Sequence, residues 1–172
     1  SSAGPRRRRH TPTHRPRSRG GLTVAVVLPD TSVLVAAFCD WHEHHAVAAP
    51  PLAAALRLRT VVVAGPVLAE AYAVLTRLPS PHRLSPASAR SLLSANLEGA
   101  RTVTLEGAGY WSCLTAAAER QVAGGRTYDA VVVACALRAH ADRILTLNRR
   151  DFEPLVPPNL TVVATIAGGA VV

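Results

Sequence analysis

The segment "VAVVLPDTSVLVAAF", residues 24–38, carries a single carboxylate, Asp30, between two apolar runs. The first run is rich in β-branched residues, as is typical of a buried strand, whereas "TSVLVAAF" (31–38) begins with two residues that often cap helices. We therefore predict that a strand over residues 23–28 ends just before Asp30 and that a short helix follows it. A carboxylate at such a buried junction is almost never left unpaired, so Asp30 requires partners from other segments.

Short β-branched runs alternate with longer helical stretches along the rest of the chain. This alternation is typical of a parallel sheet with right-handed crossovers, so we predict an α/β domain built on about five parallel strands. The other strands are expected at residues 60–64, 101–105, 143–147 and 159–164. Helices are expected at residues 42–58 (kinked or broken at Pro50-Pro51), 66–78, 85–97, 108–122 and 127–140.

The positive charge of the chain is concentrated in its first residues. All 19 basic residues are Arg, and the formal net charge is +8 over 172 residues. Residues 1–21 hold seven Arg and no acid, which leaves 12 Arg against 11 acids in the remainder. The charge therefore does not by itself indicate a nucleic-acid-binding domain. We predict a disordered Arg-rich tail over 1–21, with Val24 and Val26 as candidate alternative translation starts, and one folded domain over 22–172.

Cysteine content and hydropathy exclude several classes of protein. The three cysteines show no C-x-x-C spacing, which argues against a disulfide framework or a zinc site and is typical of a reducing cytosol. No apolar run approaches the ~18 residues of a membrane span. The apolar run after the Arg-rich start ends without a small-residue cleavage pattern, so we do not expect a signal peptide. We predict a cytoplasmic protein that does not enter membranes.

Four separate segments of the chain place acidic or amide side chains at one edge of the predicted sheet. Asp30 follows the first strand, Glu70 lies early in the helix after the second, and Asp129 lies in the first turn of the helix that leads to the fourth. Asn148 and Asp151 come directly after the fourth strand. Because sites in open α/β sheets form beyond the carboxyl ends of the strands, we expect these five residues to form one site.

Each of these acids, taken singly, has an ordinary structural role as a helix cap or a solvated helix residue. Together they would repel, since two carboxylates ~5 Å apart cost roughly 3 kcal/mol at an effective dielectric of ~20. Protons or cations must therefore intervene. An all-oxygen set without His or Cys suits Mg²⁺ or Mn²⁺, which in nucleases activates water and neutralises a phosphodiester. We predict a metal site.

Four pieces of the sequence resemble PIN-domain ribonucleases, and specifically the VapC toxins of bacterial type II toxin–antitoxin pairs. They are "PDTSVLVAAF", "LAEAYAVLTRLP" followed by "SPHRLSP", "YDAVVVACALRAHADRILTLNRRDF" and a closing strand, in the family's order over about residues 24–165. The resemblance implies a three-layer α/β/α PIN-like fold and a Mg²⁺- or Mn²⁺-dependent endoribonuclease that acts on RNA. It also implies a homodimer and a VapB-type antitoxin whose tail fills the acidic groove, with DNA contacted only through that antitoxin.

The resemblance also assigns roles to individual residues. Asp30, Glu70 and Asp129 match the family acids that hold metal, and we predict that they are catalytic together with Asp151. The hydroxyls of Thr31 or Ser32, and of Thr146, match residues that line the site and are candidate substrate contacts.

The fourth acidic position departs from the family pattern. Many relatives have Asp where this chain has Asn148, which can coordinate a metal only through its neutral carbonyl oxygen. Asp151 is a candidate to supply the missing charge. The adjacent Arg149 and Arg150 have two readings, a solvated turn or contacts to the RNA backbone, which their guanidinium groups suit.

Two other readings of the function remain open from the residues. Asn148 favours a metal-poor PIN-like module that binds RNA or a protein without cleaving it. A phosphohydrolase of another α/β class would need a D-x-D-x-T signature, but Asp30 is followed by Thr-Ser-Val. The "WHEHH" segment (41–45) is interpreted as a solvated or substrate-facing part of a helix rather than a zinc site. Tyr110 and Trp111 are expected to pack in the core or at a dimer contact.

Overall fold

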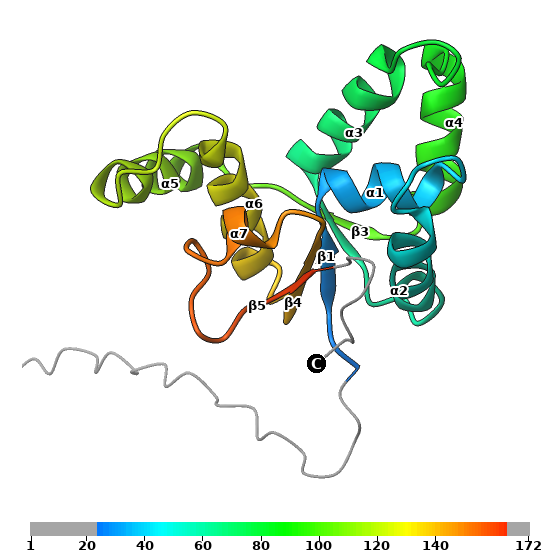
Figure 1. The fold of residues 1–172 in the computed structure, drawn as a ribbon. Helices are drawn as coiled ribbons and strands as arrows, with labels where there is room; N and C mark the ends of the chain where they lie inside the picture. Colours follow the sequence, from blue (N-terminus) through cyan, green and yellow to red (C-terminus); the bar gives the residue numbers. More distant parts are fainter. Residues whose placement is uncertain (1–23, 165–172) are drawn as a thin grey trace, which may run out of the picture.

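The computed structural model describes residues 24–164 (Figure 1). The predicted Arg-rich tail lies outside these residues. Five short parallel strands form the centre of the fold: β1 (Val27–Pro29), β2 (Val62–Ala64), β3 (Arg101–Val103), β4 (Arg143–Thr146) and β5 (Thr161–Ala164). β4 lies between β1 and β5, and β2 pairs with β3. A parallel bridge from Val27 to Val61 joins these two ladders, so the spatial order is β3-β2-β1-β4-β5.

Seven helices connect these strands within the described residues. They are α1 (Thr31–Phe38), α2 (His45–Arg57), α3 (Gly65–Arg77), α4 (Pro86–Leu97), α5 (Gly107–Glu119), α6 (Arg126–Arg138) and α7 (Arg149–Phe152). β1 and β2 are buried along their whole length, as expected for strands covered by helices on both faces. The fold is therefore the predicted α/β/α arrangement of parallel strands between helices (Figure 1).

The helices differ from the sequence-based expectation in two respects, the start of α2 and the presence of α7. The helix predicted from residue 42 begins at His45, so Trp41 and His42 lie in a turn instead. It also continues through Pro50 and Pro51. Pro50 cannot donate to the carbonyl of Ala46, but both residues are exposed, so water can satisfy that carbonyl. The short helix α7 was not predicted, because four residues are too few for a helical hydrophobic period.

The core is built from aliphatic side chains, as the scarcity of aromatic residues requires. Leu28, Leu34, Leu75 and Ile144 are completely or almost completely buried, and Phe152 is the largest buried side chain. The three cysteines are free thiols, in agreement with the absence of a disulfide framework. Within residues 24–164 no helix is both long and apolar enough to cross a membrane.

The strand order fixes where a crevice opens. The chain leaves β1 toward β2 and β3 on one side, whereas β4 and β5 lie on the other side of β1. The connections that leave β1 and β4 therefore diverge at their carboxyl ends, which is where ligands bind in open α/β sheets. The Asp30 amide donates to the Leu145 carbonyl at 2.9 Å, so the two strands remain paired up to the edge of this crevice.

Replacing Ile144 by Ala should test the central position of β4. Ile144 has no exposed surface, so the truncation should lower the free energy of unfolding by about 2–5 kcal/mol in urea denaturation. The matched control is Leu58→Ala at an exposed side chain, which should change it by less than about 0.5 kcal/mol. Similar losses in both variants would contradict the assignment of Ile144 to the core.

Candidate active site

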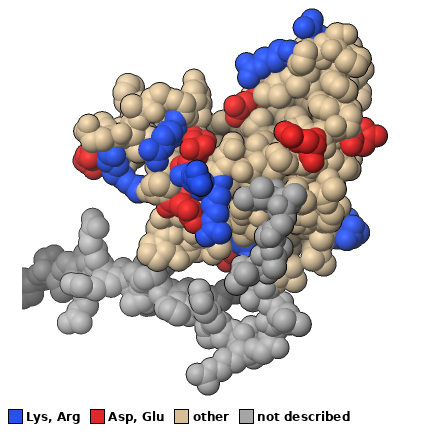
Figure 2. All heavy atoms as spheres, viewed as in Figure 1, with Lys and Arg blue, Asp and Glu red and all other residues tan. Residues whose placement is uncertain are grey.

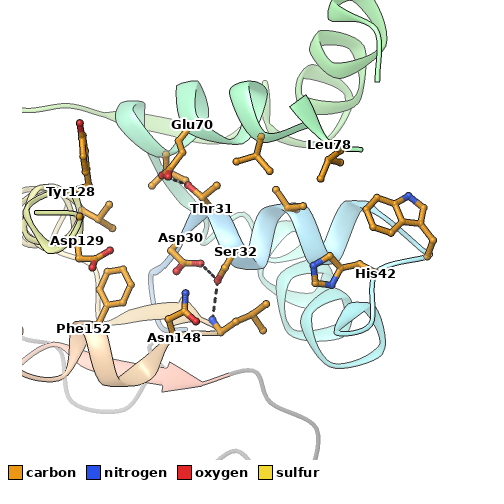
Figure 3. A pocket seen from close by; sticks show the side chains of 17 residues that line it. Asp30, Thr31, Ser32, His42, Glu70, Leu78, Tyr128, Asp129, Asn148 and Phe152 are labelled. Atoms are coloured by element: carbon orange, nitrogen blue, oxygen red, sulfur yellow. Dashed lines mark hydrogen bonds between the residues drawn. The ribbon is translucent and has the colours of Figure 1, made fainter. Parts of the chain in front are cut away.

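A groove of about 520 Å³ opens beyond the carboxyl ends of β1 and β4 (Figure 3). Four of the five predicted metal ligands line it, and they come from four separate segments: Asp30 from the end of β1, Glu70 from α3, Asp129 from α6 and Asn148 from the end of β4. Asp151 lies on α7, is exposed, and is not among the residues that line the groove. The fold thus brings together residues up to 118 positions apart in the chain, counted from Asp30 to Asn148.

Asp30 is held by three hydrogen bonds at the base of the groove. It is the N-cap of α1, and its Oδ1 accepts from the Val33 amide at 3.0 Å and from the Ser32 hydroxyl at 2.7 Å. Its Oδ2 accepts from the Thr146 hydroxyl at 2.7 Å. Oδ1 is therefore saturated, whereas Oδ2 retains one lone pair. The side chain is a helix cap and a groove residue at the same time.

The predicted substrate-contacting hydroxyls belong to this hydrogen-bond network. Thr146 is fully buried and also accepts from the Asn148 amide at 2.9 Å, so it orients Asp30 and Asn148 and cannot touch a substrate. Ser32 accepts from the Leu147 amide at 3.0 Å and thereby links the start of α1 to the end of β4. Thr31 donates to Glu70 Oε2 at 2.7 Å. Thr31 and Ser32 do line the groove, but both hydroxyls are already engaged (Figure 3).

The electrostatics of the groove reflect its crowded carboxylates. Burial raises the pKa of Asp129 to about 6, with further contributions from the negative charges of Asp151, Asp30 and Glu70, and Arg126 opposes the shift. Burial also raises the pKa of Asp30, against the hydrogen bonds from Ser32, Thr146 and Val33. Asp151 therefore acts on Asp129 through its charge, although it does not line the groove.

The donor set fits a small divalent cation. Within residues 24–164 no three His, Cys, Asp or Glu side chains lie close enough together to bind one metal ion as they stand. Mg²⁺ does not require one, because it keeps several waters and uses only one or two protein carboxylates. Every side chain that faces the groove from the predicted set offers oxygen. Burial and the neighbouring negative charges raise the pKa of Asp129, and a cation would offset both effects. The free lone pair of Asp30 Oδ2 gives such an ion a fixed ligand.

The two predicted phosphate contacts lie outside this groove. Arg149 forms an ion pair with Glu153 one turn away on the surface. Arg150 is exposed and is not among the lining residues. On the face shown in Figure 2, basic and acidic side chains are interspersed over the lobe formed by α5, α6 and α7.

Several groove residues were not predicted as site residues. Trp41, His42, Leu78, Tyr128 and Phe152 all line the groove. The His42 ring accepts from the His44 amide through Nδ1 at 3.1 Å, and burial lowers its pKa, so the neutral ring presents an Nε2–H donor. The "WHEHH" segment indicated a substrate-facing surface, but only the turn geometry shows which His faces the groove. The position of Tyr128 next to Asp129 was the available signal for that residue.

The aromatic pair on α5 is not part of the core of this chain. Trp111 is 74% exposed and Tyr110 is 37% exposed. Only Ala117 is buried on α5, because this helix stands at the margin of the sheet and packs mainly on α6. The expectation of core packing is therefore wrong for Trp111, and the expectation of a dimer contact stays a prediction.

Comparison with known families agrees with this geometry. A family model described as "PIN domain" matches residues 27–154, so the fold is that of a PIN domain. Ribonuclease VapC40 of Mycobacterium tuberculosis is 39% identical over 128 residues, which span 74% of this chain and 90% of that protein. Ribonuclease VapC27 of the same species is 33% identical over 121 residues, 70% of this chain and 83% of the relative. The chain belongs to the VapC family of PIN-domain proteins.

Solved structures support the fold alone. VapC20 of M. tuberculosis, described as a sarcin–ricin loop cleaving toxin, aligns with a TM-score of 0.56 at 16% identity and covers 69% of this chain and 86% of that chain. VapBC2 of Rickettsia felis, bound to a DNA fragment from its promoter, aligns with a TM-score of 0.57 at 17% identity. The alignment covers 80% of this chain and 97% of that chain.

Replacing Asp129 by Asn should stabilise the protein when no divalent metal is present. The pKa of Asp129 is raised in the folded state, to about 6 from an ordinary value of 3.8, so the folded protein binds more protons between these values and loses stability as the pH rises through them. The Asn side chain does not ionise, so the variant does not lose stability in this pH range. Because Asp129 is only half-buried, we expect a gain of about 1 kcal/mol at pH 7.5, which shrinks as the pH falls from 6 towards 4.

Urea denaturation in EDTA at several pH values measures this effect. Glu119→Gln removes an exposed carboxylate of α5 that does not line the groove, and it serves as the matched control. A gain for Asp129→Asn that is equal at pH 7.5 and pH 4.5 would contradict electrostatic crowding as its cause.

Proposed function

We propose that the protein is a toxin endoribonuclease that cleaves RNA with a divalent cation held at the acidic groove. The observation that carries this proposal is the convergence of Asp30, Glu70 and Asp129 on one groove, where burial and, to a smaller extent, the neighbouring negative charges raise the pKa of Asp129 to about 6. Such an arrangement is unfavourable for a structural surface and suits a site that receives a cation. The similarity to ribonucleases VapC40 and VapC27 supports the same reaction class.

Within this proposal each residue has a defined task. Asp30, Glu70 and Asp129 would hold Mg²⁺ or Mn²⁺ between them, one or two directly and the remainder through water bound to the ion, and Asn148 would offer its carbonyl oxygen. When bound, the ion activates water and neutralises charge on the phosphodiester during cleavage. Thr146, Ser32 and the Val33 amide fix the carboxylate of Asp30, so its free lone pair keeps one direction. Thr31 restrains Glu70 in the same way from the other side of the groove.

We further propose that a VapB-type antitoxin inhibits the enzyme by occupying this groove. The protein of R. felis with the same fold is a VapBC complex bound to promoter DNA. A basic side chain of an antitoxin would neutralise the crowded carboxylates, as a cation would, and would block access of RNA. Homodimer formation and contact with DNA through the antitoxin complete this proposal.

Cleavage assays with purified protein test the proposed enzyme. Asp30→Asn, Glu70→Gln and Asp129→Asn should each lower the rate of RNA cleavage by roughly 100-fold or more while the far-UV circular dichroism stays unchanged. EDTA should abolish cleavage by the parent protein, and added Mg²⁺ or Mn²⁺ should restore it. Glu119→Gln is again the control and should cleave at the normal rate. Full activity of Asp129→Asn in EDTA would refute the mechanism.

Expression in bacteria adds a second readout for the same variants. The parent chain should arrest growth, Asp129→Asn should not, and co-expression of a VapB-type antitoxin should restore growth. Robust expression of folded protein without toxicity or cleavage would favour the alternative, a metal-poor module that binds RNA or protein.

The neutral amide at position 148 has its own test. We infer that the charge of Asp151, which acts on Asp129 electrostatically, partly compensates for Asn148. Asp151→Asn should then raise the Mg²⁺ concentration for half-maximal cleavage by roughly 2- to 5-fold, as expected for an exposed charge near an ion. Asn148→Asp should lower it. An unchanged metal titration in both variants would show that neither residue influences the ion.

A further inference from the structure

The two ends of the groove carry aromatic side chains that the proposed chemistry does not use. His42 and Leu78 lie at one end, Tyr128 and Asp129 lie at the other, and Asp30 lies between them (Figure 3). Trp41 lines the same groove, and its ring centroid is 5.9 Å from that of His42. The acidic centre is thus flanked by an indole on one side and a phenol ring on the other.

Trp41 is held in place without being buried. Its ring stacks on the His82 imidazole, with centroids 3.9 Å apart and planes inclined by 24°. Trp41 belongs to the turn between α1 and α2, whereas His82 belongs to the loop between α3 and α4, so two distant loops fix the indole. Even so, Trp41 remains 42% exposed. A partly exposed ring that is supported by stacking on another ring and lines the groove suits a stacking platform for a base.

Tyr128 is even more exposed. Its side chain is 72% exposed, although it lines the groove and precedes Asp129 in the first turn of α6. A core role does not account for a phenol ring in this position. Its attachment next to a groove carboxylate places the ring within reach of any molecule bound at the acidic centre.

Charge alone does not attract RNA to the acidic centre of the groove. The groove carboxylates repel RNA phosphates, and on the face drawn in Figure 2 the basic side chains are interspersed with acids. Aromatic side chains offer a source of affinity there that does not depend on the charge of the RNA backbone. Stacking of an unpaired base on an aromatic side chain strengthens binding by roughly 5- to 150-fold per base and needs no positive charge.

We propose that Trp41 and Tyr128 stack the nucleobases on either side of the phosphate that enters the acidic groove. This inference rests on the proposed ribonuclease function and deepens it. Bases can stack on protein side chains only when they are unpaired, so the substrate is single-stranded or looped RNA rather than a duplex. Stacking tolerates every base, so these two residues select unpaired RNA and not a particular sequence.

Binding of short RNA probes tests the proposal separately from cleavage. The full chain carrying Asp129→Asn, in Mg²⁺, provides a background in which RNA should bind without being cut. The probes are a fluorescently labelled single-stranded RNA, its abasic counterpart with the same number of phosphates, and the corresponding RNA duplex. In this background Trp41→Ala and Tyr128→Ala should each weaken binding of the single strand by roughly 5- to 150-fold.

Matched variants show whether the aromatic ring is the cause. Trp41→Phe and Tyr128→Phe keep a ring and should retain most of the affinity, which also guards against misfolding of the alanine variants. Leu58→Ala removes a large exposed side chain that does not line the groove and should leave RNA binding unchanged. The abasic probe should bind weakly and alike to all variants, and the duplex should bind more weakly than the single strand.

Two outcomes would overturn the inference. One is normal affinity of both alanine variants for single-stranded RNA. The other is an equal loss of affinity for the abasic probe, which would indicate a change of backbone contacts instead. These outcomes are distinguishable from failure of the proposed function: if the parent protein cuts RNA but the alanine variants behave normally, only the stacking role fails. If the parent protein binds single strands through both rings but cuts nothing, the ribonuclease proposal fails.

Discussion

The hydrogen bonds of the Asp30 carboxylate are the constraint on which the site depends. A carboxylate that is only 6% exposed requires partners, and Asp30 finds them in the Val33 amide and in the hydroxyls of Ser32 and Thr146. Because Thr146 ends β4 and Asp30 follows β1, this cluster ties two strands that are far apart in sequence. The same few atoms cap α1, join the carboxyl ends of β1 and β4, and form the base of the groove.

The groove illustrates how a functional site is placed at the expense of stability. The folded protein would be more stable if Asp129 were neutral. The raised pKa of Asp129 reflects its desolvation by burial and its repulsion by the neighbouring carboxylates. The rest of the domain offsets this cost through a well-packed aliphatic core around Leu28 and Ile144. The end of β1 and the starts of α3 and α6 hold the acids at one groove, where the proposed cation would meet them.

The aromatic side chains at the two ends of the groove come mainly from loops. The turn that contains Trp41 and the loop that contains His82 meet only in three dimensions, and their stacked rings form one end of the groove. The opposite end is formed by Tyr128 on α6. Chemistry at the centre thus comes from the ends of strands and the starts of helices, whereas the surfaces that would select RNA come from two loops and one exposed side chain.

The order and type of nearly all elements could be predicted from the residues, because β-branched runs, cap residues and helix-starting prolines are local signals. Ser85 is an example, since it caps α4 as its position before Pro86 predicts. The sequence also pointed to Asp30, Glu70, Asp129 and Asn148 as neighbours through the rule for strand ends, and the tertiary structure places all four at one groove. Three features could not be predicted in this way: Thr146 is buried beneath Asp30, Asp151 lies outside the groove and Trp41 lines it. These features depend on distances between segments that are far apart in the chain, and no local pattern of residues encodes such distances.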